Sequence, residues 1–338
     1  MAEANRPHRP GGVAVIAGYH IASHAQQPPD DRRLAALASL CFGSYPGVLR
    51  PSLGFVRWFL RRPGLAPALS QAAWHGDELV ASLFVTEAVL SVGLSPCRVG
   101  LVDTVMTAPE HRGQGLASAL IKRAIDAAAS LGLEAMLLYT SPDTGPYRLY
   151  ASLGFRHVKS LDYWRRPPGA CSGSEPCAWE TLLSPEPEDL AAEYEQLMLS
   201  HDGVPVHDAR LWRWRKRQRP ASIRPTLWRV RGQGAPAMAT CARLRLTGEG
   251  SSLLLSDVLF SEPACLQALC ARMPPDIPLI TVADTNDSQM RTALELAAFR
   301  PGAQEAMLSY CLDSGGAIAA LSASKRPWLP LTESIIGI

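Results

Sequence analysis

A glycine-containing turn in the first half of this 338-residue chain is the segment best suited to chemistry on an anion. It lies in VMTAPEHRGQGLASALIKRA (Val105 to Ala124), where Gly113 and Gly115 precede a run with helical periodicity. Glycine lets backbone amides approach a ligand closely, and the start of a helix leaves amide donors unpaired at the positive end of its dipole. We therefore predict that the amides from Gly113 to Ser118 bind a diphosphate. Basic side chains add positive charge nearby, with Arg112 as the first candidate and His111 or Lys122 as others.

The turn alone leaves a second interpretation open. Two glycines before a helix also occur in tight turns that bind nothing. The spacing does exclude two better-known phosphate loops, because no Gly-Lys-Ser/Thr follows as in a Walker loop. The third glycine of a dinucleotide-binding fingerprint is also missing after Gly115.

The elements expected around this turn form a mixed sheet flanked by helices. An amphipathic helix is predicted from Gln114 to Leu131, because apolar residues recur every three or four positions. A strand precedes it (98–106) and a buried strand follows it (136–140), which implies parallel pairing inside the sheet. The other elements expected in the first half are strands at 19–25, 69–75, 79–92 and 155–164, and helices at 31–41, 53–61 and just before 153. The predicted fold class is α/β, with a mostly antiparallel, twisted mixed sheet that contains a central parallel strand pair.

The second half of the chain repeats the first. The segment MLLYTSPDTGPYRLYASLGFR from Met136 aligns without a gap with ITVADTNDSQMRTALELAAFR from Ile280, so that Phe155 meets Phe299. Two further echoes occur upstream in the same order, FVRWFLRRP against LWRWRKRQRP and LVDTVMTAP against LSDVLFSEP. Because an internal repeat specifies architecture, we predict two tandem domains of the same fold.

The second copy lacks the glycine turn. The interval from Asp103 to Met136 is ten residues longer than the interval from Asp257 to Ile280, and the missing part corresponds to the turn. A Pro-, Gly- and Ser-rich stretch, RRPPGACSGSEP from Arg165, is expected to link the copies. The predicted organisation is a flexible leader (1–16), a catalytic domain (17–166), a linker (167–177), a degenerate copy (178–313) and a tail (314–338). The tail is expected to dock on its own chain or on a partner subunit.

The turn resembles the acetyl-CoA motif of the GNAT (Gcn5-related N-acetyltransferase) superfamily, Arg/Gln-x-x-Gly-x-Gly/Ala, through Arg112, Gly115 and Ala117. The resemblance implies that acetyl-CoA binds here as a co-substrate and that the strand end pairs its backbone with the pantetheine arm. Thr107 stands where the family usually has valine, and backbone pairing tolerates that change. The cofactor-binding residues implied in this way are Val105, Met106, Thr107, Arg112, Gly113, Gln114, Gly115, Leu116, Ala117 and Ser118.

A second motif, LYASLGF from Leu149 to Phe155, resembles the L-Y-x-x-x-G-F signature of the same family. The resemblance implies that Tyr150 is catalytic, with its phenol facing the cofactor sulfur as the general acid for the leaving thiolate. The alternative for Tyr150 is a half-buried ring whose hydroxyl only finds a partner. The attacking amine must be neutral, which requires a base or a water chain, and Asp103 is the first catalytic candidate and Glu87 the second. Asp257 echoes Asp103 in the second copy, so a shared structural role stays open for Asp103.

Composition argues against several other classes of function. The formal charge is +2 with 19% charged residues, so there is no bulk attraction towards nucleic acid or anionic lipid. No apolar stretch reaches the roughly 18 residues of a membrane helix. The basic segment from Leu211 to Pro220 has the look of a nucleic-acid patch, but its echo in the first half favours packed tryptophans and solvated arginines. Neither the region of His201 and His207 nor the scattered cysteines have metal-ligand spacing, and reduced, buried thiols are expected.

These features predict a cytoplasmic N-acetyltransferase that transfers acetyl from acetyl-CoA to a primary amine of a small molecule or peptide by direct attack. Metal, nucleic acid and membrane are not expected as partners. Two other functions stay open, a non-catalytic acyl-CoA-binding sensor and a structural dimerisation module. The oligomeric state is open as well, including a homo-oligomer.

Overall fold

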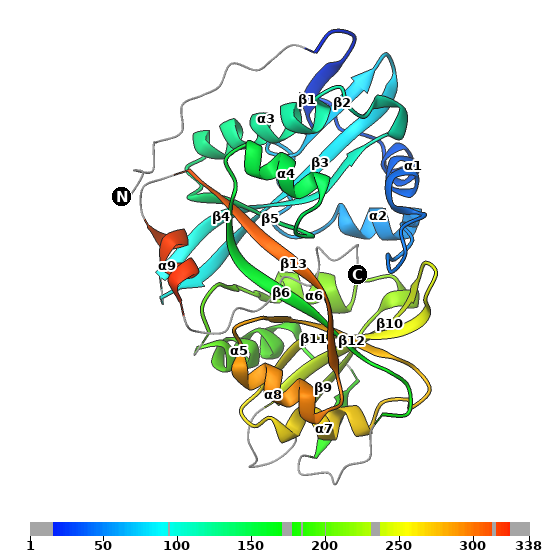
Figure 1. Ribbon diagram of the computed structural model, residues 1–338, viewed down its shortest axis with the longest axis vertical. Helices are drawn as coiled ribbons and strands as arrows, with labels where there is room; N and C mark the ends of the chain where they lie inside the picture. Colours follow the sequence, from blue (N-terminus) through cyan, green and yellow to red (C-terminus); the bar gives the residue numbers. More distant parts are fainter. Residues whose placement is uncertain are drawn as a thin grey trace. The chain divides into compact units, whose positions relative to one another are not determined.

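The computed structural model describes residues 16–93, 95–170, 178–183, 185–199, 201–230, 237–312 and 316–324 (Figure 1). The chain divides into two compact units. Among the described residues, unit 1 contains the chain up to Tyr45, Arg50–Lys159 and Ala306–Ser324, and unit 2 contains Pro46–Leu49 and Ser160–Glu305. Most of the predicted leader (1–15), linker (171–177) and tail (314–315 and 325–338) lies outside the described residues.

Unit 1 is built on a mixed sheet with the strand order β1-β2-β3-β4-β5-β13. Neighbouring strands are antiparallel except β4 and β5, which are parallel. The strands are β1 (His20–Ser23), β2 (Gln71–His75), β3 (Glu78–Val92), β4 (Ser95–Thr107), β5 (Ala135–Thr140) and the end of β13 (Arg300–Cys311). The predicted fold class, an α/β fold on a mixed sheet, is confirmed.

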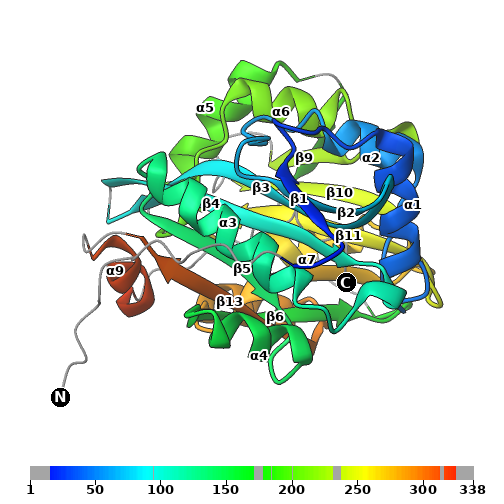
Figure 2. The same cartoon turned by 90° about the horizontal axis from the view of Figure 1, so that it is seen from above.

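Helices cover both faces of this sheet. They are α1 (Asp31–Phe42), α2 (Leu53–Phe59), α3 (Leu116–Ser130) and α4 (Gly145–Ser152), with a short 3-10 turn η1 (Pro109–His111) before α3. The long helix α3 contacts β2, β3 and β4, as Figure 2 also shows, and Leu83 and Val85 of β3 lie in its core cluster. Phe84, between them, packs against Phe59 of α2, with ring centroids 5.2 Å apart. Because successive strand residues point to opposite faces, α3 and α2 lie on opposite sides of the sheet.

Unit 2 has its own mixed sheet, in the order β6-β12-β11-β10-β9-β7, with only β11 and β12 parallel. Its elements are β6 (Arg156–Arg166), β7 (Trp179–Leu182), α5 (Pro187–Met198), β8 (Val204–Pro205), α6 (Ala209–Lys216), η2 (Ala221–Ile223), β9 (Thr226–Val230), β10 (Ala237–Leu246), β11 (Gly250–Phe260), α7 (Ala264–Ala271), β12 (Leu279–Asp284) and α8 (Ser288–Leu296). Each half of the chain runs through the same series. A strand and two helices precede three antiparallel strands, a helix, a parallel strand, a further helix and a last strand.

The last strand of each half joins the sheet of the other unit. β6 follows α4, yet Leu161–Arg166 pair with β12 in unit 2. β13 follows α8, yet Ala306–Cys311 pair with β5 in unit 1 (Figure 1). The predicted domains, 17–166 and 178–313, placed β6 and β13 each in the half of the chain that it ends. The observed units differ from this prediction at both strands. The physical reason is that the side-chain pattern of a strand specifies which face is buried, and it does not say which sheet edge the strand joins.

The C-terminal tail and the cysteines test two further predictions. The described part of the tail forms α9 (Ala317–Ala323), which docks on its own chain in unit 1 and buries Leu321 completely. The Lys159 ammonium donates to the Ser324 carbonyl at the end of this helix, at 3.1 Å. Cys265 is disulfide-bonded, so the prediction of reduced thiols throughout is wrong at that residue.

Candidate acyltransferase site

A β-bulge interrupts β4 just before the glycine turn. Ser82 of β3 lies opposite Met106, and Phe84 lies opposite Asp103, so β4 carries one extra residue between these pairs. Thr104 absorbs the insertion with φ of 50°, a conformation that is costly for a β-branched residue. Strain of this kind persists only where the surrounding structure holds it.

The bulge lies just beyond the point where β4 and β5 part. The two strands pair in parallel only from Val99–Leu101 to Ala135–Leu137, whereas β4 continues to Thr107. Within the described residues, no strand pairs with the β5-facing edge of β4 beyond Leu101. An unpaired edge presents backbone donors and acceptors to any extended ligand. Val105, Met106 and Thr107, the predicted pantetheine-binding residues, lie on this edge.

The turn that follows adopts a conformation that depends on glycine. Gly113 and Gly115 have φ of 77° and 78°, in the left-handed region. A Cβ added to either glycine would meet no heavy atom within 4 Å, so the space above both residues is open. Both glycines are exposed, together with Arg112 and Gln114. The turn therefore presents backbone rather than side chains to its surroundings.

The amides from Gly113 to Ser118 have no acceptor within the part of the chain that the structure describes. The first hydrogen bond of α3 runs from the Ala119 amide to the Gly115 carbonyl, at 3.0 Å. No side chain caps this helix, whereas Ser52 caps α2 and Thr144 caps α4. A run of free amides at the positive end of a helix dipole is an arrangement that binds phosphate oxygens. Leu116, Ala117 and Ser118 form the first turn of α3, as the sequence predicted.

The basic residues near the turn have different surroundings. Arg112 donates from Nε to the Thr107 carbonyl at 3.1 Å, which ties the turn to the end of β4. His111 shares a hydrogen bond of 3.0 Å with the Tyr19 hydroxyl, and its ring lies 5.4 Å from that of His75. Lys122 is exposed on α3. Arg112 is therefore the basic side chain that the structure fixes against the candidate site.

Tyr150 lies in the last turn of α4 and is 7% exposed. It belongs to one hydrophobic cluster with Leu116 of α3 and Val102 of β4, against which Val105 also packs. Burial raises the pKa of its phenol to about 12, so the phenol keeps its proton at neutral pH and can act as an acid but not as a base. Its hydroxyl makes no hydrogen bond to any described residue. The structure thus brings together Tyr150, the end of β4 and the start of α3.

Asp103 lies on the other face of the sheet. It is buried opposite Phe84, and its Oδ2 accepts from Arg62 at 3.2 Å while its Oδ1 accepts from Thr104 Oγ1 at 2.8 Å. Burial raises the pKa of this carboxyl above its usual range, and the Arg62 charge opposes that rise. The structure does not place Asp103 beside Tyr150. The other base candidate, Glu87, is half-buried and paired with Arg98 at 3.5 Å.

Unit 2 has the same backbone features without the reactive groups. Asp257 has φ of 50° at the corresponding bulge, and Arg215 holds its carboxylate through two hydrogen bonds of 2.9 and 2.7 Å. The amide of Phe299 donates to the carbonyl of Leu294 as that of Phe155 does to Tyr150. Leu294 therefore stands where unit 1 has its tyrosine.

Sequence reasoning missed the arginine that holds Asp103. The proline-anchored echo aligns Arg62 with Arg219, whereas the buried partner of Asp257 is Arg215, about one helical turn earlier.

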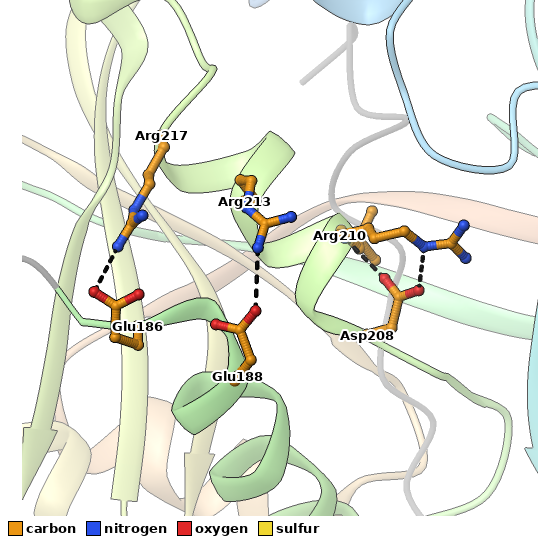
Figure 3. Close-up of polar contacts among 7 residues, drawn as sticks. Glu186, Glu188, Asp208, Arg210, Arg213 and Arg217 are labelled. Atoms are coloured by element: carbon orange, nitrogen blue, oxygen red, sulfur yellow. Dashed lines mark hydrogen bonds and ion pairs between the residues drawn. The ribbon is translucent and has the colours of Figure 1, made fainter.

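The basic segment of α6 is neutralised by neighbouring acids. Figure 3 shows Arg213 paired with Glu188 and Arg217 paired with Glu186, while Arg210 pairs with Asp208. Trp212 and Trp214 are 0% and 1% exposed, so neither indole is free to stack on a base. This arrangement removes the charge and the aromatic faces that a nucleic-acid site requires.

Neither a metal-binding cluster nor a membrane-spanning helix is found among the described residues. No group of three or more His, Cys, Asp and Glu side chains in that part of the chain is placed to hold a metal ion. None of the helices found there is long and apolar enough to cross a membrane.

A family model matches a segment that includes the glycine turn, and several solved structures share the fold. Residues 27–158 match the family model of the acetyltransferase (GNAT) domain. A GCN5-related N-acetyltransferase from Anabaena variabilis superposes with a TM-score of 0.65 at 16% identity, over 87% of this chain and 73% of that one. N-myristoyltransferase from Saccharomyces cerevisiae, with bound myristoyl-CoA and inhibitors, gives 0.65 at 11% identity over 91% and 84%. A conserved Enterococcus faecalis protein, described as a probable N-acyltransferase, gives 0.62 at 12% identity over 87% and 73%. No curated protein sequence matches the chain.

Proposed function

Because residues 27–158 belong to the GNAT family of acetyltransferases, we propose that this protein is an acyl-CoA-dependent N-acyltransferase. Acetyl is the proposed acyl group, and a primary amine of a small molecule or peptide is the proposed acceptor. The observation that carries this proposal is the run of amides from Gly113 to Ser118 beside the edge of β4, for which the described part of the chain supplies neither an acceptor nor a pairing strand. These amides fit a diphosphate, and the free edge fits the extended pantetheine arm.

Each step of the proposed transfer uses a group in unit 1. A backbone amide near Val105 or Thr107 polarises the thioester carbonyl, which the neutral amine attacks. The carbon–sulfur bond then breaks, and Tyr150 donates its proton to the departing sulfur. The phenolate formed in this way is a strong base, because burial raises its pKa to about 12, and it regains a proton from solvent or from the product ammonium.

Asp103 has a structural part in this proposal. Both of its carboxylate oxygens are engaged, one by Arg62 and one by Thr104. Asp257, which occupies the bulge position of Thr104 in unit 2, also pairs with a buried arginine although that unit has leucine in place of the tyrosine. We assign the deprotonation of the amine to water for this reason. Asp103 then serves to hold the bulge in β4.

Unit 2 is proposed to be a degenerate copy of the same domain. Leu294 replaces the tyrosine, and Pro263 directly precedes α7 where unit 1 has its glycine turn. A working second site would require both the tyrosine and the glycine turn.

The test is a thiol-release assay with acetyl-CoA over a broad panel of amines, aminoglycosides included, combined with calorimetry of coenzyme A binding. Amine-dependent release supports the enzyme. Binding without release from any amine supports the alternative, a non-catalytic acyl-CoA sensor. Absence of binding at micromolar ligand removes both. A series of acyl donors of increasing chain length then identifies the acyl group.

A further inference from the structure

A tyrosine of the exchanged strand packs on the end of α4. Tyr310 lies on β13, opposite Met136 of β5. A Cβ added to Gly154 would come within 3.1 Å of Cε2 and 3.5 Å of Cδ2 of Tyr310, so the ring lies directly on this glycine. Its centroid is also 5.6 Å from that of Phe155.

These contacts lead directly to Tyr150. The Phe155 amide donates to the Tyr150 carbonyl at 3.1 Å, and the two rings are 6.0 Å apart. Gly154, between Tyr150 and Phe155, has φ of 99°, so the backbone reverses direction there. The conformation of this reversal depends on the side chains that pack against it. Tyr310 therefore packs against the backbone reversal at Gly154 and so supports the last turn of α4, which holds Tyr150.

The copy without the catalytic tyrosine has a different residue at this register. Ile280 of β12 corresponds to Met136 of β5, and the residue opposite Ile280 is Arg165. Arg165 forms an ion pair with Glu249 instead of stacking on aromatic rings. Trp164, the preceding residue of β6, shares a hydrophobic cluster with Phe299 and Leu294, so the exchanged strand of unit 2 also contributes an aromatic residue near this turn.

We propose that β13 of the C-terminal half is a working part of the N-terminal site, in which Tyr310 is a positioning residue for Tyr150. This inference rests on the proposed function. It adds that the second half of the chain controls the rate of transfer although its own copy of the site has lost the reactive groups. A phenol that donates a proton must be held at the departing sulfur, and a displacement of about 1 Å at such a group costs up to roughly a hundredfold in rate.

The test compares three variants of the full-length chain. Tyr310→Leu removes the ring, and Tyr310→Phe keeps it. Met307→Ala is the matched control, because Met307 is fully buried on the same strand and points to the opposite face of the sheet. Its truncation lowers stability without touching Gly154 or Phe155.

The expected kinetic result is a split between kcat and KM. Tyr310→Leu lowers kcat about tenfold or more and changes the KM for acetyl-CoA less than about threefold. Tyr310→Phe stays within about twofold of the parent protein in both constants. Met307→Ala keeps kcat at temperatures where it is folded. An unchanged kcat in Tyr310→Leu, or an equal loss in Met307→Ala, overturns the proposal.

A second measurement does not depend on catalysis. Hydrogen exchange of the peptide spanning 150–155 is expected to be at least about tenfold faster in Tyr310→Leu than in the parent protein or in Met307→Ala. If no amine gives thiol release, the proposed function fails, and the exchange rates still decide whether Tyr310 holds the end of α4. Unchanged exchange overturns the positioning role even if the protein is an acyltransferase.

Discussion

Tyr150 is the residue on which the proposed chemistry depends. Replacing it with phenylalanine removes the proton donor and leaves the ring packing intact, so we expect kcat to fall about a hundredfold with little change in the KM for acetyl-CoA. Because the pKa of Tyr150 is raised to about 12, the parent enzyme should show no alkaline loss of rate from this group below roughly pH 11. Steady-state rates of the two proteins from pH 6 to 10 check this, and equal kcat values would exclude the general-acid role.

Gly154 and Ala298 occupy equivalent backbone positions and offer a matched pair of substitutions. Ala298 has φ of 61°, where alanine is strained and glycine is not. We expect Ala298→Gly to raise the free energy of unfolding by about 0.5 kcal/mol, the strain relieved less the chain entropy added. Gly154→Ala should lower it by more than about 1 kcal/mol, because the new methyl meets both the left-handed backbone and the Tyr310 ring. Chemical denaturation checks both signs, and a destabilised Ala298→Gly protein would contradict this interpretation of the turn.

The residues of the candidate site were predictable to different degrees. The glycine turn, the helix start and Tyr150 were predicted because short-range spacing specifies them, and the structure brings them together. Asp103 was predicted as a base because its position on β4 was visible from the sequence. Its face relative to the cofactor-binding residues that follow was not, because the bulge after Asp103 shifts the alternation of the strand. Arg62 was missed for a related reason, since its partnership forms only in three dimensions.

At the scale of elements, the ion pair between Arg62 and Asp103 joins the end of α2 to the bulge of β4. Arg62→Leu leaves a buried carboxylate without its counter-charge, and we expect the free energy of unfolding to fall by about 3–5 kcal/mol at pH 7. The loss should be smaller at pH 5. Burial raises the folded-state pKa of Asp103 above its unfolded value, so without Arg62 stability is retained at low pH and lost as pH rises. The double variant Arg62→Leu, Asp103→Asn should recover part of the loss, and a loss that is equal at both pH values would contradict the ion-pair explanation.

The order of helices and strands in each half followed from periodicity and turn residues. The helix predicted at 114–131 is α3 (Leu116–Ser130), and the strand predicted at 136–140 is β5. Boundaries shifted by a few residues, as with β4, which begins at Ser95 rather than at 98. Such shifts are expected, because backbone pairing continues a strand past its last clear side-chain signal.

At the scale of the whole molecule, the exchanged strands make each half incomplete by itself. A chain that stops after residue 177 lacks β13, which leaves β5 without its antiparallel neighbour and Phe155 without the Tyr310 ring. We expect this fragment to aggregate, because the strand that has lost its neighbour becomes an edge whose backbone donors and acceptors can pair with other chains. Co-expression with residues 178–338 should restore a soluble complex. Size-exclusion chromatography checks this, and a monomeric, cooperatively folded 1–177 fragment would contradict the role of β13.

The exchange itself could not be predicted from the sequence. β6 and β13 have the burial pattern of ordinary last strands, and the internal repeat aligned each with its own half. Which sheet a last strand completes depends on chain connectivity and on competition between two similar edges. Local side-chain patterns do not encode that competition.

The proposed function depends on the amides from Gly113 to Ser118 binding the diphosphate of coenzyme A, and calorimetry on Ser118→Asp examines this contact. Ser118 lies in the first turn of α3, where a new carboxylate favours the helix dipole and should stabilise the fold by about 0.3–1 kcal/mol. The same charge repels a bound diphosphate. We expect micromolar binding of coenzyme A to the parent protein and near-parent binding to the neutral control Ser118→Asn. Binding to Ser118→Asp should be at least about tenfold weaker, at equal or higher thermal stability. Equal affinity in Ser118→Asp and the parent protein, or no binding to the parent protein at all, would contradict it.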